Sequence, residues 1–103
     1  MTDHITDTHT LTISVIQHAN LQIQNVQAPT SVEIGDPFNV SYEVINNGAT
    51  DTCWGHILDG TTELTGSRWE DTISSGAIKS VTYSFTNGIT EDKTITIETG
   101  YKN

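Results

Sequence analysis

Basic residues and long apolar runs are both scarce in this chain. Only 4 Lys and Arg stand against 13 Asp and Glu among 103 residues, which gives a formal net charge of -9. Nucleic-acid binding takes most of its affinity from basic side chains that neutralise phosphates, so we expect no nucleic-acid partner. An anionic membrane surface would repel the chain, and no run of 18 apolar residues is present, so we expect no membrane insertion.

Cysteine is nearly absent as well. Cys53 stands alone, which excludes an internal disulfide and a Cys-rich metal site. The first residues, Met-Thr-Asp-His-Ile-Thr-Asp, lack the basic region and apolar stretch of a signal peptide. Two alternatives follow for the chain's origin: it is a product made without export, or it is a piece of a longer secreted chain.

No stretch of ten or more residues has the apolar spacing of an amphipathic helix. Apolar side chains instead recur at every second position, as in strands with one buried face. This alternation predicts an all-β fold, and 103 residues suffice for one domain. Strands are expected at 10–16, 21–28, 38–44, 52–58, 61–64, 81–85 and 94–98, with a short extended piece at 31–34 and a less regular stretch at 66–76 that contains Trp69.

Turn residues separate these segments at intervals of roughly 8 to 12 residues, the spacing typical of a β-sandwich. Gly35-Asp36-Pro37, Asn46-Asn47-Gly48, Asp59-Gly60 and Asn87-Gly88 supply the Gly, Asn and Pro that tight turns favour. We therefore predict an immunoglobulin-like antiparallel sandwich of about seven strands over residues 18–103, preceded by an extra strand or arm at residues 1–17.

Several segments of the sandwich region combine strand alternation with turn residues at regular offsets. They are Leu21-Gln22-Ile23-Gln24-Asn25-Val26 with Pro29, Val32 to Val44, Asn46-Asn47-Gly48, Leu58-Asp59-Gly60 and Gly76 to Phe85. With these residues the region resembles, over about residues 20 to 100, the CARDB family, immunoglobulin-like domains of bacterial and archaeal surface proteins. The resemblance implies adhesion or assembly rather than chemistry, and it carries over no catalytic residues. The chain lacks the second Cys of antibody-type domains, and Trp54 is expected at their buried Trp position.

Residues 1–17 lie outside this resemblance. Leu11, Ile13 and Val15 alternate there with Thr and Ser, so residues 10–16 form either an extra edge strand or an arm that pairs with a neighbouring chain. We name these three apolar residues as a candidate partner interface. Trp69 joins them because it lies in the least regular segment beside two charged residues, and its replacement by Ala is expected to weaken assembly while leaving folding largely intact.

We find no set of residues that predicts catalysis. His4, Asp7 and His9 are ligand types that Zn²⁺ accepts, but they lie in a polar terminus, so we expect no metal and no cofactor. Cys53 and His56 are three apart, which on a strand sends them to opposite faces. Cys53 is then a small core residue, and the chain is not expected to be an enzyme.

Two functions fit these observations. In the first, the chain is a structural protein on a virion surface, such as a capsid decoration, turret or tail component. In the second, it is a CARDB-type adhesion module excised from a secreted cell-surface protein, with an extracellular or cell-surface location. In both hypotheses the partners are other protein chains, either copies of this one or capsid and tail proteins.

Overall fold

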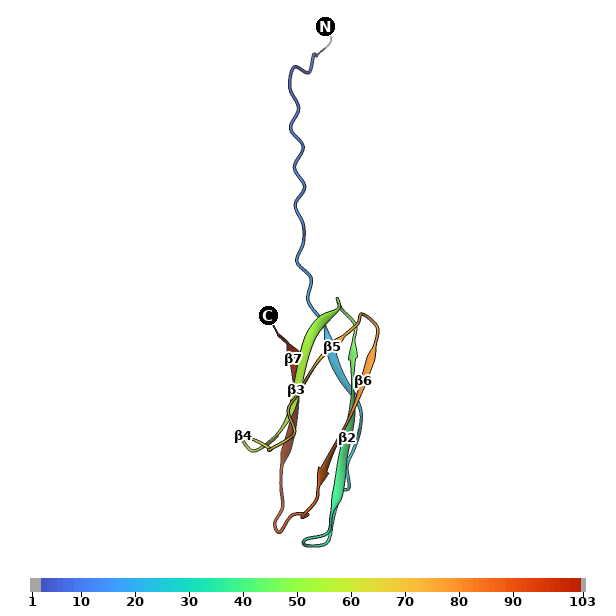
Figure 1. Cartoon of the computed structure of the whole chain (residues 1–103), viewed down its shortest axis with the longest axis vertical. Coiled ribbons are helices and arrows are strands. Elements are labelled where there is room, and N and C mark those ends of the chain that lie inside the picture. Colours follow the sequence, from blue (N-terminus) through green and yellow to red (C-terminus); the bar gives the residue numbers. More distant parts are fainter. Residues whose placement is uncertain (1–2, 103) are drawn as a thin grey trace.

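The computed structural model describes residues 3–102, which contain seven strands and no helix (Figure 1). None of the described residues belongs to a helix that could cross a membrane. The strands are β1 (Leu21–Gln27), β2 (Phe38–Asn46), β3 (Asp51–Asp59), β4 (Thr62–Glu63), β5 (Trp69–Ile73), β6 (Ile78–Phe85) and β7 (Ile95–Tyr101).

The strands form two antiparallel sheets that face each other as a β-sandwich. The first sheet has the order β1-β2-β6. In the second sheet β3 is central, with β7 along one edge and β4 and β5 pairing with opposite ends of its other edge. The predicted all-β sandwich of about seven strands is thereby confirmed.

Alternation of side chains along the two central strands builds the core. Val40, Tyr42 and Val44 of β2 are buried, and so are Cys53 and Ile57 of β3, while the residues between them face outward. The predicted core role of Cys53 is confirmed, and His56 lies on the opposite face of β3. Partly buried side chains from β1, β5, β6 and β7 extend this core.

The extended piece expected at 31–34 is not part of a strand, and its last residue, Ile34, begins a turn with Gly35. Two sequence-based expectations were wrong. The stretch expected to be irregular contains β5. Trp54 does not fill a buried Trp position. Cys53 and Gly55 face the core, so the residue between them must face outward, and Trp69 enters the core instead.

Asn46 organises the end of the sandwich from which the N-terminal segment leaves. Its side chain is fully buried, and its Nδ2 donates to the carbonyls of Ala49 and Ile73 at 2.8 and 2.9 Å. Its Oδ1 accepts from the backbone N–H groups of Asn20 and Gly48 at 3.2 and 2.9 Å. All of its polar atoms are therefore satisfied, which a buried amide requires.

Candidate assembly interface

Residues 3–17 extend away from the sandwich as an arm, which we call the N-terminal arm (Figure 1). The described chain measures 88 Å along its longest axis against 23 and 21 Å along the others. No strand of the described chain pairs with the arm, so residues 10–16 are not an edge strand of their own sandwich. The predicted interface residues Leu11, Ile13 and Val15 are 75%, 88% and 80% exposed.

The base of the arm is held firmly by residues 18–20. The ring of His18 stacks on Tyr101 with 4.4 Å between centroids, and Ala19 is buried. Backbone N–H groups of Ala49 and Asn47 donate to the carbonyls of His18 and Asn20. A Cβ on Gly48 would lie 2.6 Å from both the Asn20 nitrogen and the His18 oxygen, so only Gly allows this close approach. The point at which the arm leaves the sandwich is therefore fixed.

The outer edges of β1 and β7 meet along one side of the sandwich, which we call the seam. Leu21 and Ile23 of β1 pair with the buried Asn46 and Val44, so they face the core, and Ile97 of β7 pairs with the buried Ile57. Ile95 faces the same way, and all four side chains are only partly buried. Within the described residues no strand covers the free edge of β7.

A hollow of about 690 Å³ opens at the end of the seam farthest from the arm. Its apolar lining includes Phe38, Val40, Phe85 and Ile95, with Ile34 at 76% exposed on the rim. Lys93, Glu91 and Asp92 supply charge around it. No His or Cys is among the residues that line it.

Trp69, the fourth predicted interface residue, belongs mainly to the core. Its Nε1 donates to the hydroxyl of Tyr42 at 2.8 Å, and Tyr42 is only 1% exposed. The indole also covers Gly55, where an added Cβ would lie 2.5 Å from the ring. From this position we expect the replacement of Trp69 by Ala to destabilise the fold as well, in contrast to the expectation from sequence.

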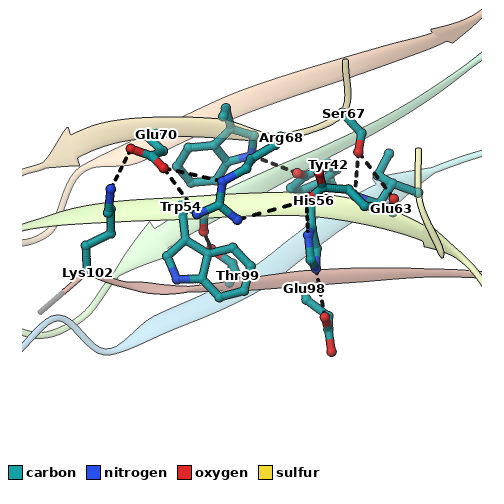
Figure 2. Close-up of polar contacts among 12 residues, drawn as sticks. Tyr42, Trp54, His56, Glu63, Ser67, Arg68, Glu70, Glu98, Thr99 and Lys102 are labelled. Atoms are coloured by element: carbon teal, nitrogen blue, oxygen red, sulfur yellow. Dashed lines mark hydrogen bonds and ion pairs between the residues drawn. The ribbon is translucent and has the colours of Figure 1, made fainter. Parts of the chain in front are cut away.

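The outward face of β3 carries a network of charged side chains that the sequence did not reveal (Figure 2). His56 contacts Glu63 through Nδ1 at 2.5 Å and Glu98 through Nε2 at 2.8 Å. Arg68 lies 5.0 Å from the ring of Trp54 and pairs with Glu70, which also receives Lys102 at 2.8 Å. The carboxylates come from β4, β5 and β7, so only the strand register brings them together.

The hydrogen bond that His56 donates to Glu98 is the largest cause that raises the pKa of His56 above its usual 6.5, and Glu63 acts in the same direction. Both ring nitrogens are thereby engaged, which leaves neither free to take a proton from a substrate. Burial raises the pKa of the Cys53 thiol, which makes it a poor nucleophile. These two groups are structural in character.

Metal-ligating side chains do not gather anywhere in residues 3–102 in a group of three or more that could hold an ion. His4, Asp7 and His9 lie on the exposed arm. No family model matches the sequence, and no curated protein or solved structure matches it significantly.

Proposed function

We propose that this chain is a non-enzymatic structural module that assembles with other protein chains by strand pairing through residues 10–16 of the N-terminal arm. The observation that supports it is an alternating apolar segment held out in solvent by a rigid base. Leu11, Ile13 and Val15 are each at least 75% exposed. Burying each such side chain is worth roughly 1.5–3 kcal/mol, so the exposed arm is a strong driver of association.

Strand addition suits this arm chemically. Backbone hydrogen bonds to an exposed sheet edge supply affinity, and alternate side chains that enter pockets supply specificity. Residues 10–16 contain no charged side chain, no Gly and no Pro, so nothing in them opposes a continuous ladder. The immunoglobulin-like fold and the settings on a virion surface or in a cell-surface adhesin stay predictions, and the proposal applies in either setting.

The test is the solution mass of the purified chain and of two single-residue variants. Ile13→Asp places a charge on the apolar face of the arm, whereas Ser14→Asp places the same charge on the opposite face. Sedimentation velocity should find oligomers for the wild type and for Ser14→Asp and monomers for Ile13→Asp. A wild-type chain that stays monomeric at high concentration would overturn the proposal.

A further inference from the structure

We infer that the occupant of the β7 edge is the N-terminal arm of a second copy of this chain, added as an antiparallel strand that closes the seam between β1 and β7. This inference rests on the proposed function and names the partner and the surface. It pairs the exposed apolar segment of the arm with the edge of β7 that no strand of the described chain covers. The result is a head-to-tail chain of sandwiches.

Strand direction favours the stacking of copies in one orientation. β7 ends at the base of the arm, because Tyr101 stacks on His18, and it begins at the opposite end beside the hollow. The arm runs along the long axis toward its own sandwich (Figure 1). If a second copy in the same orientation lies alongside this arm, its β7 runs antiparallel to the arm. The first residue of that β7 then lies near the point where the arm joins the first copy's sandwich.

A reciprocal exchange between two copies has the opposite geometry. A partner inverted to exchange arms would present its β7 parallel to the incoming arm, and parallel pairing is slightly less stable per residue. A repeated head-to-tail contact joins different surfaces on the two copies. Such heterologous contacts form rings if the rotation closes and open filaments if it does not.

The other sheet edges are less suited to receive a strand. β1 has a register shift between Gln24 and Gln27, with Asn25 at a positive φ of 51°, and such bulges disturb an edge ladder. On the side of β5 and β6, Lys79 faces inward, lies 5.1 Å from the Trp69 ring and pairs with Asp71 at 3.2 Å. An inward-pointing charge is a recognised way to block an edge. β4 has only two residues.

The arm and β7 also match in length and pattern. β7 has 7 residues, as do positions 10–16, and apolar and polar side chains alternate over 10–15 of the arm and 95–98 of β7. An antiparallel register that places Val15 beside Ile95 also places Ile13 beside Ile97 and Leu11 beside Thr99. The three apolar arm residues then enter the seam, and Val15 lies at the mouth of the hollow. Asp7 of the arm reaches the end of β7 next to Lys102.

This register predicts a disulfide between two copies. Ser14 and Thr96 are both exposed and would lie directly opposite each other on the outward face. One preparation carries Ser14→Cys and the other Thr96→Cys, so the mixed species joins two different molecules. After mild oxidation, intact-mass spectrometry should find the mixed dimer as the main cross-linked product. In the control, Thr82→Cys on exposed β6 replaces Thr96→Cys and should give no enrichment of the mixed dimer.

The outcomes separate the two proposals. Oligomers that depend on Ile13 but yield no Ser14→Cys/Thr96→Cys mixed dimer overturn the β7 site and leave assembly through the arm standing. A monomeric chain overturns both. Equal cross-linking at Thr96→Cys and Thr82→Cys means non-specific contact and overturns the β7 site. The double variant Ser14→Cys/Thr96→Cys provides a second test. Head-to-tail pairing should link its copies into a series of covalent multimers, and a reductant should return these to monomers.

Discussion

The protonation of His56 depends directly on its surroundings. Its side chain is only 14% exposed and lies between the carboxylates of Glu63 and Glu98. Those contacts, with the Glu98 hydrogen bond first, hold its pKa in the folded chain above the 6.5 of the unfolded chain. Between the two values the folded state binds more protons, so stability falls as pH rises.

The stabilisation from His56 should be complete below about pH 6.5 and lost as pH rises through the raised pKa. Urea unfolding of the monomeric Ile13→Asp variant, with and without His56→Gln, checks this between about pH 5.5 and 8.5. The difference in free energy of unfolding should shrink with increasing pH. A constant or growing difference contradicts the expected linkage.

The two tryptophans offer a matched comparison of inner and outer positions. Trp69 packs on the core and donates to Tyr42, whereas Trp54 faces outward beneath Arg68. Trp69→Ala should lower the free energy of unfolding by about 3 kcal/mol, near the bottom of the range for buried aromatics, because its ring is partly exposed. Trp54→Ala should cost about 1 kcal/mol. Equal losses in urea unfolding would show that Trp69 is not a core residue.

At the scale of elements, alternation predicted β2, β3, β6 and β7 well, because each has one buried face and a clear period of two. It also predicted strand character at 10–16, but the described chain provides no partner there. Alternation shows which face of a segment is apolar, but it does not show which part of the structure covers that face. The same limit explains the segment 31–34, where extended residues end in a turn.

The hydrogen bonds and ion pairs of the polar side chains could not be predicted from the sequence. His56 lies 42 residues from Glu98, and only the pairing of β3 with β7 places them opposite each other. Asn46 looked like a turn residue beside Asn47 and Gly48, yet it is fully buried. Its four hydrogen bonds depend on where residues 18–20 and Ile73 lie. Sequence spacing carries none of this information.

At the scale of the whole molecule, charge opposes the assembly that the arm favours. Each copy carries a formal charge of -9, and a head-to-tail contact brings two acidic sandwiches together. The pairing segment 10–16 is itself uncharged, so its binding comes from apolar burial and backbone hydrogen bonds. Salt shortens the range of repulsion, since the Debye length falls from about 10 Å at 0.1 M to about 3 Å at 1 M.

Association should therefore strengthen with salt. We expect the dissociation constant to fall on the order of tenfold between about 0.1 and 1 M NaCl, because repulsion between the sandwiches is screened while apolar burial persists. Sedimentation equilibrium measures it directly. Ile13→Asp serves as the control and should stay monomeric at both salt concentrations. Weaker association in high salt would show instead that ion pairs, such as Asp7 with Lys102 of the next copy, hold the contact together.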